Sequence, residues 1–225
     1  MPHFADGLGL TVHVRTTIRQ NYSYIESTAI KIGDSILEVS SYGQYILDGI
    51  SNAEMPNALS GYDVVHTSHR KDQDLFLIDL GADLQLVVKV YKDLVNVDFD
   101  ISTGGDANSM FRGTVGLMGN WLNGTHYARD GVTVLEDSGV FGQEWQVLDT
   151  EEHMFMTDRT PQYPEKCVMP DLAARSSRRL GEAKVSPQAA GMACSYLKER
   201  HAYDMCVYDV IATGDLSLAG EGLYY

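Results

Sequence analysis

Two neighbouring stretches in which apolar and polar residues alternate constrain the fold of this chain more than any other feature. In 84–91 and again in 94–101 every second residue is apolar, and two residues separate the stretches. A period of two is that of a β-strand whose two faces differ, and a two-residue connection joins antiparallel strands. The sequence therefore predicts a hairpin. We expect Asp98 and Asp100 to point to solvent, because an unpaired carboxylate is costly to bury.

The same alternation recurs upstream, in short stretches separated by turn residues. Short strands at this spacing are typical of an antiparallel meander. We expect strands at 10–18, 23–32, 36–40, 45–47, 64–66 and 75–80, a loop at 51–60, a polar run at 68–74, a buried strand at 115–118, and short closing strands at 132–135 and 144–148. The fold class predicted for residues 1–150 is mainly β, an antiparallel β-sandwich-like meander.

The character of the sequence changes after residue 150. Three prolines between 161 and 170 interrupt regular structure. The arginine-bearing stretch 173–184 is compatible with a short helix or an exposed linker, and we prefer the linker. Ser186 followed by Pro187 is the pattern of a helix start. We therefore expect a β domain at 1–150, a linker at 151–186 and a small helical extension at 187–225, with helices at 189–200 and 203–211.

The three cysteines are Cys167, Cys194 and Cys206, so at least one thiol has no partner within the chain. In one unbroken helix the last two would lie about 18 Å apart, whereas a disulfide requires Cα atoms within about 7 Å. If Cys194 and Cys206 pair, the chain must reverse between them, and we place the reversal at 200–202. That pairing would give a stapled α-helical hairpin. The alternative is two buried free thiols.

Composition excludes several functional classes. The chain has 225 residues, of which 44% are apolar and 21% charged, as in a globular protein. Its net charge of −14 argues against nucleic-acid binding, which needs clustered lysine and arginine. The sequence has no apolar run near the roughly 20 residues of a membrane helix. Residues 1–7 do not read as a signal peptide, which suggests either a cytosolic chain or a piece of a longer secreted protein.

No combination of residues in the sequence predicts catalysis. There is no His-Glu-x-x-His, no Gly-x-Ser-x-Gly and no phosphate-binding glycine-rich loop. His66 and His69 are three residues apart, which on a loop or strand is more often a surface pair than a metal site. Trp121 and Trp145 are expected in the core rather than on a ligand platform. We therefore expect no enzymatic activity.

One turn-rich segment carries a family resemblance. It consists of Gly116-Leu117-Met118-Gly119-Asn120, then Asn123-Gly124, Asp130-Gly131 and Phe141-Gly142-Gln143-Glu144-Trp145-Gln146-Val147. In order and spacing it resembles the von Willebrand factor type D domain, which shows Gly-Leu-Cys-Gly-Asn, an acidic loop and Phe-Gly-x-x-Trp-x-Val. The resemblance covers about residues 7–148. The segment around Cys194 and Cys206 is similar to a reduced form of the cysteine-rich extension that often follows such domains.

The chain departs from the family pattern at several positions. Met118 stands where the family has cysteine, so the family's usual disulfide cannot form there. The family's opening strand is missing or eroded, with Pro2-His3-Phe4 and Asp6-Gly7 as its candidate remnant. The resemblance thus implies an N-terminally shortened domain with an exposed sheet edge. Cys167 would then lack a partner that lies upstream in a longer protein.

The resemblance also implies calcium as the one candidate cofactor. In the family, an aspartate of the first strand and Asn and Asp residues of the loop bind one calcium ion. Asn120 matches directly, Asn123 matches with a one-residue insertion, and Asp130 is a further candidate. The family's acidic pair falls at 125–126, where this chain has no carboxylate. Calcium prefers six to eight oxygens with charge among them, so we favour a turn held by asparagine side chains and keep calcium as the alternative.

Two N-glycosylation sequons are present, at Asn21 and Asn123. In a secreted protein the loop residue Asn123 is the better acceptor. A glycan at Asn123 would conflict with calcium ligation by the same side chain.

These observations predict a non-enzymatic extracellular module with a structural, adhesive or protein-interaction role, within a longer secreted or cell-surface protein. Its expected partners are other proteins or extracellular matrix components, not nucleic acid, and we expect no membrane insertion. The alternative is a carbohydrate-binding or glycan-processing β-sandwich module. It is suggested by Asp98, Asp100 and the polar loops, although exposure alone explains loop polarity.

Overall fold

The computed structural model describes residues 9–19, 22–70, 73–81, 83–101, 111, 114–120, 123–158 and 185–220. The chain divides into two compact units. The first contains residues 1–16 and 25–167, and the second contains residues 17–24 and 168–225.

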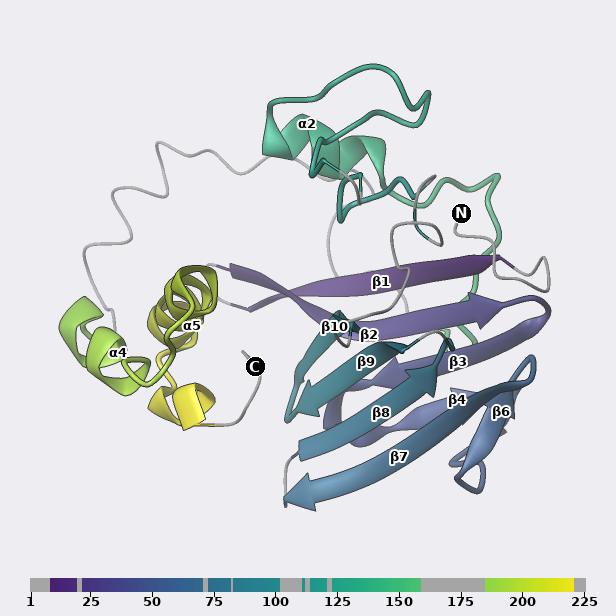
Figure 1. Cartoon of the computed structure of the whole chain (residues 1–225), viewed down its shortest axis with the longest axis horizontal. Helices are drawn as coiled ribbons and strands as arrows, with labels where there is room; N and C mark the ends of the chain where they lie inside the picture. The colour runs from purple at the N-terminus through teal and green to yellow at the C-terminus, as the bar shows by residue number, and fades with distance from the viewer. Residues whose placement is uncertain are drawn as a thin grey trace. The chain divides into compact units, whose positions relative to one another are not determined.

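The described part of the first unit holds two antiparallel five-stranded sheets (Figure 1). One sheet has the order β1-β2-β3-β4-β5, formed by β1 (Leu10–Arg19), β2 (Tyr22–Ile32), β3 (Ser35–Ser40), β4 (Tyr45–Leu47) and β5 (Ile50–Ser51), with the 3-10 turn η1 (Ser41–Gly43) between β3 and β4. The other has the order β10-β9-β8-β7-β6, formed by β6 (Asn57–Leu59), β7 (Tyr62–Arg70), β8 (Gln73–Asp79), β9 (Leu84–Tyr91) and β10 (Leu94–Ile101). Within each sheet, strands adjacent in sequence are adjacent in space, so the predicted meander is confirmed.

The predicted hairpin is the pair β9 and β10. Val95 lies opposite Val90 and Phe99 lies opposite Leu86, so the apolar residues share one face. The alternating residues Asp98 and Asp100 are exposed, as expected. The apolar faces of the two sheets form one core, which includes Ile30, Ile32, Leu37 and Val39 of the first sheet and Phe76, Ile78, Leu86, Val88 and Val90 of the second. The mainly β, sandwich-like fold class is therefore confirmed.

Several predicted elements of the β domain are wrong. β7 and β8 extend into the polar run 68–74, and β6 lies within the expected loop 51–60. Polar residues can continue a strand when a neighbouring strand supplies hydrogen-bond partners for their backbone groups. Predicting the strand ends from polarity alone therefore misplaced them.

The three strands predicted at 115–118, 132–135 and 144–148 do not form. Gly116 and Gly119 adopt positive φ, which ends any extended run in the first. Within the second, Val134 makes only an isolated bridge to Tyr127. The third is replaced by the end of helix α2 (Ser138–Glu144) and a following turn, because Asp137 caps that helix by accepting from the N–H groups of Gly139 and Val140.

The second unit contains α4 (Pro187–Ala193), α5 (Arg200–Thr213) and the 3-10 helix η2 (Leu216–Gly220). Ser186 caps α4, as predicted. The helix predicted at 189–200 ends early, at Ala193, and α5 begins at Arg200 with Glu199 as its N-cap. The chain therefore reverses at 194–199, before the predicted 200–202.

The reversal brings Cys194 and Cys206 into a disulfide with Cα atoms 6.0 Å apart, and both residues are buried. The stapled helical hairpin is therefore present, and two free thiols are not. None of the described helices is both long and apolar enough to cross a membrane. Several predicted features lie outside the described residues, namely residues 1–7, Asn21, Trp121, Cys167 and the arginine-bearing stretch 173–184.

Candidate functional site

The family-like segment folds as a series of hydrogen-bonded turns rather than as strands. We call residues 114–151 the motif segment, of which 114–120 and 123–151 are described. Its first turn is closed by the Gly119 N–H, which donates to the Gly116 carbonyl at 2.9 Å. A Cβ on Gly119 would meet the Gly124 carbonyl oxygen at 3.3 Å. The second glycine of the motif is thus required by both its positive φ and a close backbone approach.

The predicted calcium ligands hold turns together. The Asn123 side-chain oxygen accepts from the Thr125 N–H at 2.9 Å, and the Asn120 backbone exchanges hydrogen bonds with Gly124 and Thr125. The Asp130 carboxylate accepts from the N–H groups of Val132 and Thr133 and from the Thr133 hydroxyl. These hydrogen bonds, led by the Thr133 hydroxyl, lower the pKa of Asp130. The described residues contain no cluster of three or more His, Cys, Asp or Glu suited to a metal.

Arg129 makes several contacts within the motif segment. Its guanidinium donates to the backbone carbonyls of Glu144 (2.7 Å) and Gln146 (2.6 Å) and to the Glu151 carboxylate (2.5 Å). It also lies over the Trp145 ring, 5.1 Å from the centroid. The Leu148 N–H and then Arg129 lower the pKa of Glu151. One side chain therefore joins the turn at 129 to the chain after α2.

Aromatic side chains also make contacts within these turns. Trp145 is half-buried and donates its indole N–H to the Tyr127 carbonyl at 3.0 Å. His126 stacks on the buried ring of Phe141 with centroids 4.3 Å apart. The expectation that Trp145 lies in the core is therefore wrong: it is half-buried within the motif segment, where its polar edge has a partner.

The motif segment exposes many large apolar side chains even though it is tightly hydrogen-bonded. Val132 is 77% exposed and Met118 is 65% exposed. The full exposed apolar set is Val115, Leu117, Met118, Val132, Val134, Val140, Val147 and Leu148. Because ordered turns hold these residues away from any core, the set is a candidate contact surface.

Residues 152–157, which we call the strap, cross the outer face of the first sheet. Met154 is buried, and Glu152 pairs with Lys31 of β2. Arg15 of β1 lies over the Phe155 ring, 4.1 Å from its centroid, and donates to the Thr157 carbonyl at 3.2 Å. The strap therefore covers residues that would otherwise face solvent on this side of the sheet.

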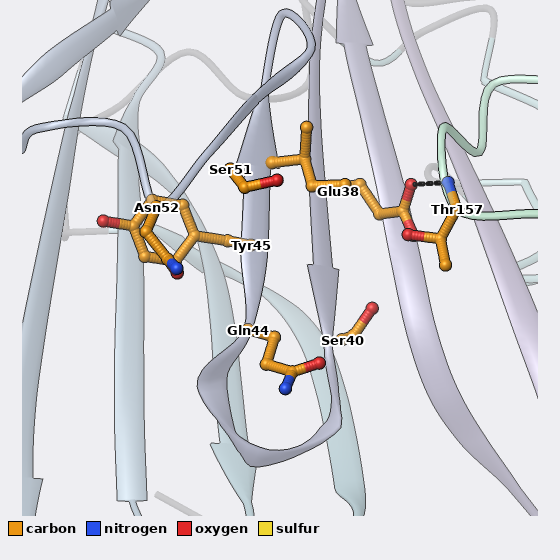
Figure 2. Close-up of a pocket in the computed structure, with 8 residues that line it drawn as sticks. Glu38, Ser40, Gln44, Tyr45, Ser51, Asn52 and Thr157 are labelled. Carbon is orange, nitrogen blue, oxygen red and sulfur yellow. Dashed lines mark hydrogen bonds between the residues drawn. The ribbon is translucent and has the colours of Figure 1, made fainter.

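A small pocket lies beside the strap (Figure 2). Its volume is about 180 Å³, and its lining residues are Glu38, Ser40, Gln44, Tyr45, Ile46, Ser51, Asn52 and Thr157. Glu38 points out of the sandwich because its neighbours Leu37 and Val39 point into the core. Its carboxylate accepts from the N–H groups of Met156 (2.6 Å) and Thr157 (3.0 Å).

Sequence reasoning missed this pocket and misjudged one histidine. Glu38 is a single acidic residue in a short strand, and its burial depends on a strap more than a hundred residues away. His66, expected on the surface, is half-buried, stacks on Phe76 with centroids 4.3 Å apart and contacts the Asp74 carboxylate at 2.8 Å. The side chain of His69 lies outside the described residues.

Comparisons with known proteins assign no family. No protein-family model matches the chain, and no curated protein matches it.

Proposed function

We propose that the chain is a non-enzymatic protein-interaction module of the von Willebrand factor type D kind, from an extracellular or cell-surface protein. The glycine, asparagine and aromatic residues of the motif segment support the family proposal. The disulfide is compatible with an oxidising compartment, where such bonds persist. The proposed partners are other proteins or matrix components.

The observation that carries the interaction role is the exposed apolar set. Exposed apolar residues are common singly, so the support for the proposal is that eight of them occur on one ordered segment. Arg129 and Asp130 fix the backbone that presents Val132, so little conformational entropy is lost when a partner binds. A binding surface of this kind requires no catalytic residues.

The test is binding of the purified full chain to a panel of purified matrix proteins and to itself, measured by biolayer interferometry. Leu117→Asp and Val132→Asp should each weaken binding by roughly tenfold or more, because a partner would bury an unpaired charge. Ser138→Asp is the matched control. It adds the same charge at another exposed position of the motif segment and should leave binding unchanged.

Two results would contradict the proposal. One is a monomeric chain that binds no protein but turns over a substrate or binds glycans on an array, as the carbohydrate alternative requires. The other is binding that Leu117→Asp and Val132→Asp leave intact.

Calcium is the proposed cofactor, and a thermal melt in EDTA and then in calcium tests it. A ligand that binds only the native state at about 100 times its Kd adds about 2.7 kcal/mol of stability. Asn120→Ala and Asn123→Ala should abolish the shift if those side chains hold the ion. A cooperative melt that calcium does not move would leave the asparagines as turn-forming residues only.

A further inference from the structure

We propose that the pocket beside the strap binds a primary ammonium group, with the Glu38 carboxylate as its counter-charge and neighbouring side-chain oxygens as hydrogen-bond acceptors. The site shares no residue with the exposed apolar set. If the ammonium proposal fails, the proposed interaction function is therefore unaffected. If the interaction function fails, the ammonium proposal is likewise unaffected.

The first argument is the chemistry of the lining. Glu38, Ser40, Gln44, Ser51 and Asn52 all present side-chain oxygens. None of the eight lining residues carries a positive charge. Arg15 contacts the strap at the Thr157 carbonyl and is not among the lining residues. The pocket therefore favours a cation that donates hydrogen bonds and disfavours an anion.

The second argument is the state of Glu38. Glu38 is only 1% exposed. One of its carboxylate oxygens, Oε2, accepts both hydrogen bonds from the strap. The other oxygen, Oε1, is buried without a hydrogen-bond partner among the described residues, and Glu38 forms no ion pair with any of them. An uncommitted buried carboxylate oxygen carries a full desolvation penalty. A donor that reaches it would therefore gain more than one that meets an exposed carboxylate.

Oε1 is covered, so an ammonium that enters the pocket first meets the hydroxyl and carboxamide groups of the lining. Turning the carboxylate would withdraw Oε2 from the N–H groups of Met156 and Thr157, so contact with Oε1 requires the side chains that cover it to move apart. Thr157 forms one wall, so the strap shapes the entrance.

Size and charge select the ligand class. A volume of about 180 Å³ is below the roughly 300–1,000 Å³ of a pocket for a drug-sized molecule, so only a small group fits. A single carboxylate is too little charge for calcium, which prefers several charged oxygens. A primary ammonium has one charge and three N–H donors, which matches one carboxylate surrounded by neutral acceptors.

The experiment titrates the full chain with propylammonium chloride and follows binding by isothermal calorimetry and by amide chemical shifts. Propylammonium should bind saturably and shift the amides around Gln44, Ser51 and Thr157. n-Propanol, which lacks the charge, and tetramethylammonium, which lacks the N–H donors, should not. Equal binding of either control, or of sodium ions, would overturn the proposal.

Variants decide which residues act. Glu38→Gln keeps an acceptor for the strap but removes the charge, so affinity should fall roughly tenfold or more. Ser51→Val replaces an exposed hydroxyl by methyl groups on an edge strand, where valine is well tolerated, and should also weaken binding. Ser138→Ala, outside the pocket, is the control. Undiminished affinity in Glu38→Gln would overturn the proposal, and if that variant does not fold, undiminished affinity in Ser51→Val would do so.

A primary ammonium can come from a lysine side chain or from an α-amino group. Nα-acetyl-lysine amide and glycinamide separate these sources. Tighter binding of the lysine derivative would support a protein lysine as the ligand, and tighter binding of glycinamide would support an α-amino group. Binding of neither would overturn the proposal.

Discussion

At the scale of single residues, the motif segment depends on backbone geometry and on one guanidinium. Gly119 and Gly131 both have positive φ, but only Gly119 has backbone atoms within contact distance of a Cβ. Arg129 satisfies acceptors at the end of α2 and in the chain after it. Neither role involves a ligand, so both are tested by stability.

Gly119→Ala should destabilise the first unit more than Gly131→Ala. Positive φ costs a non-glycine residue about 1–2 kcal/mol at either position. At Gly119 the new methyl also crowds the Gly124 carbonyl at 3.3 Å, whereas at Gly131 nothing lies within 4 Å. We expect a difference of about 1 kcal/mol in the free energy of unfolding, measured by urea titration. Equal losses would contradict the packing role of Gly119.

Arg129→Ala should cost about 1–3 kcal/mol, because it leaves carbonyl and carboxylate acceptors without a donor. Arg129→Lys should recover only part of this loss, since lysine cannot reproduce the planar fork. Trp145 fluorescence reports unfolding of the segment directly, because Arg129 lies over that ring. Arg200→Ala is the exposed comparison, whose pair with Asp204 is screened by solvent and should contribute little to stability. A similar loss in both variants would contradict the role assigned to Arg129.

At the scale of elements, the helical hairpin is organised by caps, a close approach and a crosslink. Ser186 and Glu199 start the two helices. Gly191 of α4 lets Tyr203 of α5 approach, because the Tyr203 hydroxyl lies 2.9 Å from where a Cβ would be. The Tyr196 hydroxyl donates to the Ala219 carbonyl and ties the turn between α4 and α5 to η2. Such a small unit has little core, so the crosslink matters more than it would in the sandwich.

Replacing Cys194 and Cys206 together by alanine should destabilise the hairpin. The bond closes a short loop with a sequence separation of 12, for which chain entropy predicts roughly 3 kcal/mol. Hydrogen exchange of the α5 amides measures this loss locally. Cys167→Ser keeps the pair and is the control. Unchanged protection of α5 in the double variant would show that packing alone holds the hairpin.

At the scale of the whole molecule, the sandwich core and the surface charge act in opposite directions. Both sheets bury their apolar faces in one core. The net charge of −14 favours solubility and adds self-repulsion. Lower pH reduces that repulsion, but it also protonates groups that the fold prefers to keep neutral.

His13 of β1 allows one loss of folding stability at low pH to be tested. Burial lowers its pKa below 6.5, although the nearby carboxylates of Glu151 and Glu152 act in the opposite sense. The unfolded chain therefore binds more protons just below pH 6.5, so stability should fall as pH decreases from 7.5 to 5.5, by at most about 1.4 kcal/mol per pH unit for this one proton. His13→Gln should flatten the curve, measured by urea unfolding at each pH. An identical slope in wild type and variant would contradict this assignment.

The sequence by itself determined the elements whose signals are local. Alternation of apolar and polar residues predicted the hairpin of β9 and β10, because alternate residues of a strand point to the same face. Serine before proline placed the start of α4, because the cap and the first helical residue are adjacent in the chain. The spacing of Cys194 and Cys206 correctly required a reversal, since no helix can bring them together.

Only the tertiary structure decided the elements and sites whose partners lie far away in sequence. The valines and leucines at 115–118 and 144–148 read as strands, yet no strand among the described residues pairs with their backbone and they form turns and a helix end. Glu38 is buried because the strap covers it. His66 is half-buried because it stacks on Phe76 and contacts the Asp74 carboxylate. The residue type determines which interactions a side chain can make. Whether that side chain is buried or paired depends on which distant segment packs against it.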